Sequence, residues 1–186
     1  MLKKHLLSKQ NNLGANADSG VLAAEKRYRL LALIVSAIVI AVDQAAKYWA
    51  LTTLDEGHVI NLVGPLRFRL VFNTGAAFGK FDSLGPVLGV FAFAVSIWLF
   101  SSRVMVGGRP SAIAVGSVAG GAIGNLLDRL FRAEDGVLNG AVVDFIDIRW
   151  WPVWNVADMG IVLGAVALVW CIQSRNTADT EMTGQA

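Results

Sequence analysis

The stretch GGAIGNLLDRLFRAEDGVLNGAVVDFIDIRWWPVWNVADMG, residues 120–160, organises the rest of the chain. It gathers seven polar side chains between two apolar segments, each about long enough to cross a bilayer. They are Asn125, Asp128, Arg129, Asp144, Asp147, Asn155 and Asp158. Ionisable residues placed where hydrocarbon meets water are candidates for function. Because several carboxylates can meet at one membrane surface, this stretch predicts the active region of an aspartyl hydrolase.

The composition is that of an integral membrane protein. Of 186 residues, 55% are hydrophobic and 16% are charged, whereas about a quarter of the residues in a soluble domain are charged. The net charge of +2 is too small, and the basic residues are too scattered, to indicate nucleic-acid binding. The single cysteine, Cys171, excludes an intrachain disulfide and any CxxC motif. We expect no cofactor and no metal.

Four apolar runs predict a mainly α-helical membrane protein with four transmembrane helices. They lie at about 30–51, 85–102, 111–127 and 156–172. The first run could instead belong to a signal peptide, but its length and the lack of a clear small-residue cleavage site favour a retained helix. A disordered cytoplasmic tail at 1–25 and a polar cytoplasmic tail at 176–186 would flank a four-helix membrane peptidase domain at 26–175.

The basic residues indicate an orientation. Lys26, Arg27 and Arg29 precede the first run, and Arg103 and Arg109 follow the second. Because cytoplasmic loops carry the excess of lysine and arginine, both termini should be cytoplasmic. The polar stretch then lies at the outer face, in a small extracytoplasmic β-strand element with interfacial loops.

Two outer segments alternate as strands do. From Leu66 to Phe72, apolar residues alternate with Arg67, Arg69 and Val71, and VVDFIDI at 142–148 indicates a second strand. The first ribbon could lie on the membrane with its arginines near phosphates, or it could be an ordinary half-buried sheet. Asn73, Thr74 and Gly75 then predict a turn.

The acids also have structural interpretations. Asp43 and Lys47 share one helical face and could form an ion pair near hydrocarbon. Alternatively, Lys47 holds a lipid head group, or Asp43 orients the active-site loop.

Asn155 and Asp158 have the spacing of a helix N-cap and its reciprocal acid, and Asp128 beside Arg129 could be an ion pair. Three separate acids converging on one interface nevertheless favour more than capping.

The chain resembles the lipoprotein signal peptidase (signal peptidase II) family of aspartyl membrane proteases. The resemblance rests on five motifs, which stand in the family's order: DQAAK at 43–47, FNTGAAFG at 72–79, GNLLDR at 124–129, VVDF at 142–145 and WNVAD at 154–158. The motifs spread across all four predicted spans. One departure is Trp154, where the family usually has phenylalanine.

The resemblance implies that Asp144 and Asp158 are the catalytic pair. Eight further residues match family positions thought to bind substrate or shape the site: Asp43, Lys47, Asn73, Gly75, Asn125, Asp128, Arg129 and Asn155. The implied partners are membrane lipids and a prolipoprotein whose lipobox cysteine carries diacylglyceryl, cut immediately before that cysteine. The implied location is the bacterial cell membrane, and we expect a monomer.

Two other classes of protein fit less well. A serine or metal intramembrane protease would need a serine and histidine pair or an HExxH helix, and no HExxH occurs. A small transporter would favour charges near the midplane and internal repeats.

Overall fold

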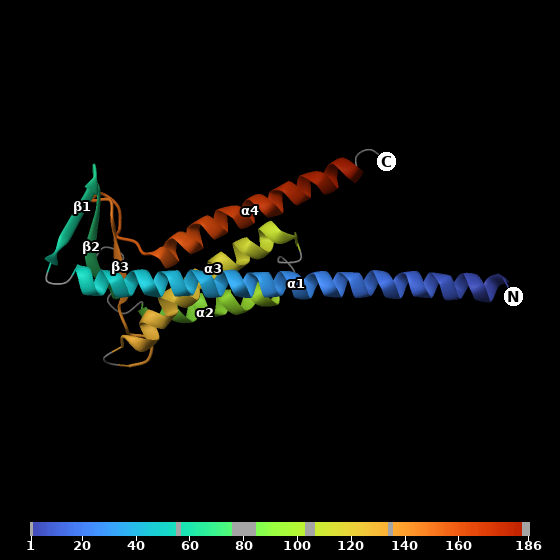
Figure 1. Cartoon of the computed structure of the whole chain (residues 1–186), viewed down its shortest axis with the longest axis horizontal. Coiled ribbons are helices and arrows are strands. Elements are labelled where there is room, and N and C mark those ends of the chain that lie inside the picture. The colour runs from blue at the N-terminus through green and yellow to red at the C-terminus, as the bar shows by residue number, and fades with distance from the viewer. Residues whose placement is uncertain (1, 55–56, 76–84, 103–106, 134–135, 184–186) are drawn as a thin grey trace.

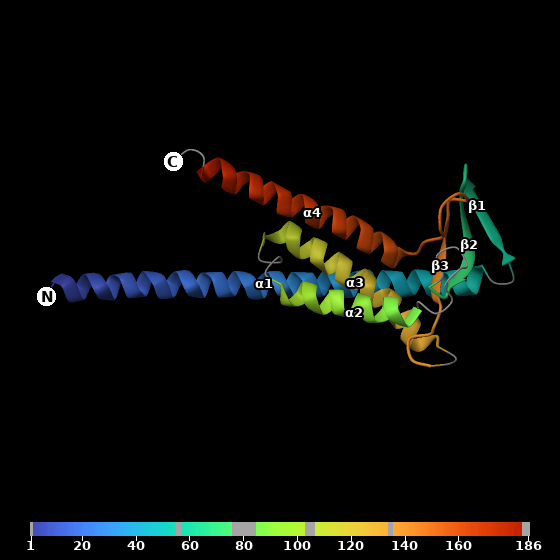
Figure 2. The same ribbon diagram turned by 180° about the vertical axis from the view of Figure 1, so that it is seen from behind.

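The computed structural model describes residues 2–54, 57–75, 85–102, 107–133 and 136–183. Over these residues the chain forms four helices and three strands. In chain order they are α1 (Leu2–Thr53), β1 (Val59–Val63), β2 (Leu66–Asn73), α2 (Gly85–Ser101), α3 (Arg109–Phe131), β3 (Val142–Asp147) and α4 (Val156–Thr183). The helices alternate in direction, and the strands lie across one end of the bundle (Figures 1 and 2). The start of α1 and the end of α4 lie at the opposite end.

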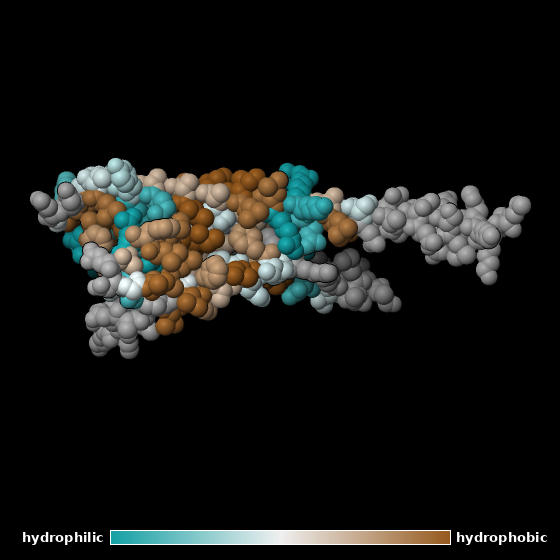
Figure 3. All heavy atoms as spheres, turned by 90° about the horizontal axis from the view of Figure 1, so that it is seen from below, coloured by the Kyte–Doolittle hydropathy of each residue, from teal (hydrophilic) through white to brown (hydrophobic). Residues whose placement is uncertain are grey.

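Three of these helices have the length and hydropathy of a membrane span: α1 from Ser19 to Thr53, α3 from Arg109 to Phe131 and α4 from Val156 to Thr177. The fourth, α2, is apolar but shorter, with its apolar part at Gly89–Ser101. The face seen in Figure 3 is mostly hydrophobic in its middle and has hydrophilic groups toward both ends. The prediction of a helix at each apolar run is confirmed.

Helical structure extends beyond the predicted spans at both ends of the chain. The predicted disordered tail at 1–25 lies within α1 from Leu2, and α4 continues through the polar segment to Thr183. Neither segment contains proline, which would break a helix, and the first is rich in alanine, leucine and lysine, which are good helix formers. In the structure the first tail is thus part of a helix, a local structure that its low hydrophobicity did not predict.

Helix α3 lies at the centre of the bundle because its glycines let neighbouring backbones approach. A Cβ added to Gly116 would lie 2.5 Å from the carbonyl oxygen of Ala32 on α1. A Cβ on Gly121 would clash with the carbonyl oxygen of Ala157 on α4. The small residues of this span therefore permit tight packing on two sides, as the sequence predicted.

The strands form one antiparallel sheet in the order β1-β2-β3. Both predicted strands are confirmed, and β1 is an additional edge strand. The sheet packs on the end of α1, where Trp49 contacts Phe68 and Phe145 at ring-centroid distances of 5.2 and 6.0 Å. Strand β2 is mostly half-buried, as expected for an ordinary half-buried sheet. In the β2–β3 register, Val71 faces Asp144, which brings Asn73 beside that acid.

Candidate active site

Asp144 and Asp158 line one pocket of about 250 Å³. Asp144 comes from β3 and Asp158 from the first turn of α4, so the two acids reach the pocket from different elements. The other lining residues are Asn73, Gly89, Ala92, Ala122, Asn125, Leu126, Arg129, Val142 and Ile161. Both the sheet and the helices therefore contribute polar and apolar residues to the pocket.

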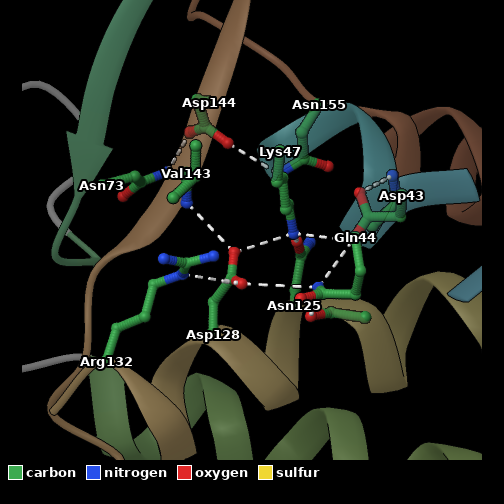
Figure 4. A network of polar contacts seen from close by, with 12 residues as sticks. Asp43, Gln44, Lys47, Asn73, Asn125, Asp128, Arg132, Val143, Asp144 and Asn155 are labelled. Carbon is green, nitrogen blue, oxygen red and sulfur yellow. Dashed lines mark hydrogen bonds and ion pairs between the residues drawn. The ribbon is translucent and has the colours of Figure 1, made fainter. Parts of the chain in front are cut away.

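Three asparagine amides orient the two acids. Asn73 Nδ2 donates to Asp144 Oδ2 at 2.9 Å, and Asn155 Nδ2 donates to Asp144 Oδ1 at 2.7 Å (Figure 4). Asn125 Nδ2 donates to Asp158 Oδ1 at 2.8 Å. Each acid is thus held by side chains from other elements, which fixes the direction in which its free lone pairs point.

Gly75 supports this arrangement through the backbone. Its N–H donates to Asn73 Oδ1 at 2.9 Å, so the opposite end of that amide faces Asp144. Gly75 has a φ of 99°, in the left-handed region that favours glycine. A side chain at this position would therefore disturb the orientation of Asn73.

Asn155 and Asp158 also form the predicted reciprocal cap of α4. Asp158 N donates to Asn155 Oδ1 at 2.9 Å, and Asn155 N donates to Asp158 Oδ2 at 3.2 Å. The capping interpretation is therefore correct for Asp158 Oδ2, while Oδ1 faces Asn125. The same acid caps a helix and lines the pocket.

Lys47 is fully buried between two acids and an amide. Its Nζ lies 2.8 Å from Asp43 Oδ2 and 2.8 Å from Asp128 Oδ2, and it donates to Asn125 Oδ1 at 2.9 Å. The predicted ion pair with Asp43 is present. With these three partners and no exposed surface, Lys47 does not hold a lipid head group in this structure.

Asp43 also fixes the start of α4. Its Oδ1 accepts a hydrogen bond from the Ala157 backbone N–H at 2.8 Å. The suggestion that Asp43 orients the site is thus supported by a direct contact with the first turn that carries Asp158.

Asp128 has partners on three different parts of the chain. Its carboxylate contacts Lys47, Arg132 Nε at 3.1 Å and the Val143 backbone N–H at 3.1 Å (Figure 4). The possible ion pair with Arg129 is not among these contacts, because adjacent residues on a helix point in different directions. Asp128 instead ties α3 to the start of β3, next to Asp144.

Arg129 extends into the pocket. The residue is 6% exposed, and its Nη1 is buried with no hydrogen-bond partner among the residues that the structure describes. A buried guanidinium N–H without a partner is costly. This atom is therefore a donor available to a group that enters the pocket.

The environment of Asp144 favours its protonated form. Burial raises the pKa of Asp144 to about 7. Hydrogen bonds from Asn73 and Asn155 and the charge of Lys47 oppose this rise, while the charge of Asp158 adds to it. A carboxyl group that titrates near neutrality can exchange a proton at working pH.

Sequence reasoning missed two residues that support the site. Gln44 Nε2 donates to Asp43 Oδ2 at 3.1 Å and to the Gly124 carbonyl oxygen at 3.2 Å. Gln44 belongs to the DQAAK motif, which was the available signal. No sequence signal pointed to Arg132, because its contact with Asp128 depends on where α3 ends.

Asp147, gathered with the other acids in the opening stretch, lies outside the pocket. It accepts hydrogen bonds from Arg67 Nε at 2.8 Å and Arg69 Nε at 2.9 Å. Burial alone would raise its pKa, but hydrogen bonds from Arg149 N and the two arginines hold the pKa of Asp147 below its usual value. These arginines therefore have a protein partner.

Within the described ranges, no group of three or more histidine, cysteine, aspartate or glutamate side chains could hold a metal ion. The polar groups that line this pocket are two carboxyl groups, two amides and a guanidinium.

Comparison with known proteins identifies the family. Residues 35–173 match the family described as signal peptidase (SPase) II, Peptidase_A8. The chain belongs to the signal peptidase II family. Signal peptidase II is an aspartic peptidase of family A8, and the chain has lipoprotein signal peptidase activity.

Curated members of the signal peptidase II family are similar over most of the chain. A lipoprotein signal peptidase of Rhodococcus jostii is 42% identical over 142 residues, which cover 76% of this chain and 71% of the relative. One from Mycobacterium bovis is 37% identical over 164 residues, covering 88% and 80%. One from Mycobacterium avium is 41% identical over 145 residues, covering 77% and 79%.

Solved structures share the fold. Two chains described as bacterial membrane enzymes align with TM-scores of 0.62 and 0.63, at 23% and 25% sequence identity. The alignments cover 79% and 76% of this chain, and 90% and 91% of those chains. The arrangement of helices and sheet is thus one that a bacterial membrane enzyme adopts.

Replacing Lys47 should destabilise the protein strongly. In Lys47→Met, the buried carboxylates of Asp43 and Asp128 lose their shared cation, at a cost of about 3–5 kcal/mol. Thermal unfolding of the purified protein in detergent measures this loss. Lys26→Met, at an exposed position of the same helix, is the matched control. Adding Asp128→Asn to Lys47→Met should restore part of the stability, and equal melting of all variants would contradict the assigned network.

Proposed function

We propose that Asp144 and Asp158 form the catalytic dyad of this peptidase. The observation that carries the proposal is Asn155, which donates to Asp144 Oδ1 and exchanges two hydrogen bonds with Asp158. One residue thus contacts both carboxylates, that of Asp144 through its side-chain amide and that of Asp158 through its backbone N–H, and both acids line the same pocket. Two carboxyl groups in one pocket are the equipment for acid–base hydrolysis without a covalent intermediate.

In the proposed mechanism the dyad holds one proton, on Asp144. Asp158, at the N-terminal turn of α4 with a donor at each oxygen, carries the negative charge and takes a proton from the attacking water. Asp144 donates its proton to the carbonyl oxygen of the scissile bond as the water oxygen bonds to the carbon. The proton held by Asp158 then passes to the leaving amine, and Asp144 recovers its own as the carbonyl reforms.

Arg129 is suited to bind the substrate. Its unpartnered Nη1 can donate to a peptide carbonyl in the pocket, which would also satisfy the buried N–H. The remaining predicted residues act on the acids. Asn73, Asn125 and Asn155 orient the two acids, and Gly75 orients Asn73. Asp43, Lys47 and Asp128 join α1, α3 and the start of α4, which carries Asp158.

The proposed substrate is a prolipoprotein whose lipobox cysteine carries diacylglyceryl, cleaved immediately before that cysteine. The family membership supports this proposal, together with the position of the pocket at the sheet end of apolar helices. The acyl chains could remain in lipid while the peptide bond reaches the acids. We propose that the enzyme acts as a monomer.

The dyad is tested by conservative substitutions. Asp144→Asn and Asp158→Asn should each lower cleavage of a diacylglyceryl-modified precursor by about 10²–10⁴-fold or more, because an amide cannot exchange the proton. Asp147→Asn is the matched control, since Asp147 lies on the same strand as Asp144 but outside the pocket. It should melt at a lower temperature yet retain turnover per folded molecule. Near-normal cleavage by either dyad variant would remove that acid from the mechanism.

The activity should depend on the proton of Asp144. Because the pKa of Asp144 is raised to about 7, the acid is protonated below that pH and loses its proton above it. The kcat/KM for a precursor without groups that titrate in this range should therefore fall as the pH rises through about 7. A kcat/KM that stays constant from pH 6 to pH 9 would contradict the role of Asp144 as the acid.

We further propose four membrane crossings, with α2 as the short one, and both termini in the cytoplasm. The alternating helix directions support this topology (Figure 1). Basic residues support it too, since Arg27 and Arg29 precede the apolar run of α1 and Arg109 begins α3. A reporter fused after Arg175 should be cytoplasmic, and one inserted at 136–139 should be outside the cytoplasm. The reverse pattern would place the dyad in the cytoplasm and contradict the proposed topology.

A further inference from the structure

The turn between β3 and α4 carries two exposed tryptophans that the peptidase site does not use. Trp150 is 74% exposed and Trp151 is 51% exposed. Their rings pack edge to face with centroids 6.1 Å apart, and Trp151 packs against Trp154 at 6.3 Å. Two large aromatic side chains thus stand together on the surface.

The conformation of this turn is fixed by a buried carboxylate. Arg149 has a φ of 62°, which is uncommon for a residue with a side chain. Its backbone N–H donates to Asp147 Oδ1 at 2.6 Å. The other oxygen of Asp147 contacts Arg67 Nη2 at 2.7 Å and Arg69 Nε at 2.9 Å. Because Arg149 keeps an uncommon backbone conformation through these contacts, the turn has one defined geometry, which is typical of functional segments.

The other end of the turn is joined rigidly to the site. The Trp154 carbonyl oxygen accepts hydrogen bonds from the N–H groups of Phe145 and Ile146, each at 2.8 Å. The next residue, Asn155, caps α4, and the apolar span begins at Val156. The tryptophans therefore lie within a few residues of the point where α4 starts its membrane-length segment.

The surroundings of the turn are basic. Arg149 is exposed, and Arg67 and Arg69 share the single carboxylate of Asp147. This group of four side chains has three positive charges and one negative charge. In Figure 1 the strands lie across the helix ends, so the sheet and its turns stand where the apolar helices stop.

We propose that the Arg149–Trp151 turn is a membrane anchor that places Trp150 and Trp151 in the head-group layer of the phospholipid bilayer. Tryptophan concentrates at this depth because its ring is apolar and its indole N–H is polar. The arginines attract anionic phosphates. Because the turn connects the strand of Asp144 to the helix of Asp158, the anchor sets the depth of both acids. That consequence rests on the proposed dyad, whereas the anchor itself does not.

The depth of the turn can be measured directly. The full chain with Cys171→Ser receives a single cysteine at position 150 or 151, carries a nitroxide label and is placed in vesicles of phosphatidylethanolamine and phosphatidylglycerol. Collision of the label with oxygen and with a water-soluble nickel complex reports its depth. The control label replaces Asn61, an exposed residue of edge strand β1.

Labels at 150 and 151 should collide several-fold more with oxygen, relative to nickel, than the label at 61. Equal accessibility to nickel at all three positions would overturn the proposal. Protection of 150 and 151 that appears only after addition of a lipidated precursor would also overturn it, and would assign the surface to the substrate. The vesicles otherwise contain no substrate, so failure of the dyad would leave this measurement unchanged.

The contribution of charge has its own test. With a label at 151, raising the share of phosphatidylglycerol should shift the label toward lipid in the parent chain. In Arg149→Gln the shift should be smaller. Thermal unfolding of each labelled chain confirms that it is folded. An equal response to phosphatidylglycerol in both chains would remove Arg149 from the anchor.

Discussion

The structure depends on one buried ammonium group, that of Lys47. Removing charges from water costs several kcal/mol per ion, so Lys47 is tolerated only with its partners in place. Asp43 supplies one carboxylate from α1, and Asp128 supplies the other from α3. Asp43 reaches on to the Ala157 backbone N–H at the start of α4. The buried charge therefore requires the three membrane-length helices to meet at one point. Gly124 allows this close packing, since a Cβ at that position would lie 2.8 Å from Asp43 Oδ2.

The orientation of the acids follows from the same cation. Lys47 donates to Asn125 Oδ1, and Asn155 Nδ2 donates to that same oxygen at 3.0 Å. Because an amide has one oxygen and one nitrogen end, these contacts turn the nitrogen of Asn125 toward Asp158. Asp144 arrives separately on the sheet, which is packed on the end of α1 by Trp49. A substitution at Lys47 would therefore alter the orientation of Asp158, although Lys47 does not line the pocket.

Structural and functional interpretations of the same residue are compatible here. Asp158 caps α4 with one oxygen and faces Asn125 and the pocket with the other. Capping holds the carboxylate at a fixed point of a rigid helix, and preorganised groups are what acid–base chemistry requires. Asp147 shows that an acid in this stretch of sequence need not line the pocket. Its carboxylate binds Arg67, Arg69 and the Arg149 backbone N–H at the turn that carries the exposed tryptophans.

The sequence by itself determined the membrane class, the four apolar helices, the two alternating strands and, through its motifs, the residues that gather around the pocket. These features are local, because they depend on hydrophobicity, on a period of 2 or 3.6 residues and on fixed spacing. It did not predict β1, whose five residues become a strand only by pairing with β2, nor the helix through residues 2–25.

Only the tertiary structure decided which polar groups far apart in the sequence are partners. Asp128 selects Lys47, some 80 positions away, instead of the adjacent Arg129, and Asn73 reaches Asp144 across the sheet. Hydrogen bonds and ion pairs depend on distances of about 3 Å and on direction, and the packing of distant segments sets both.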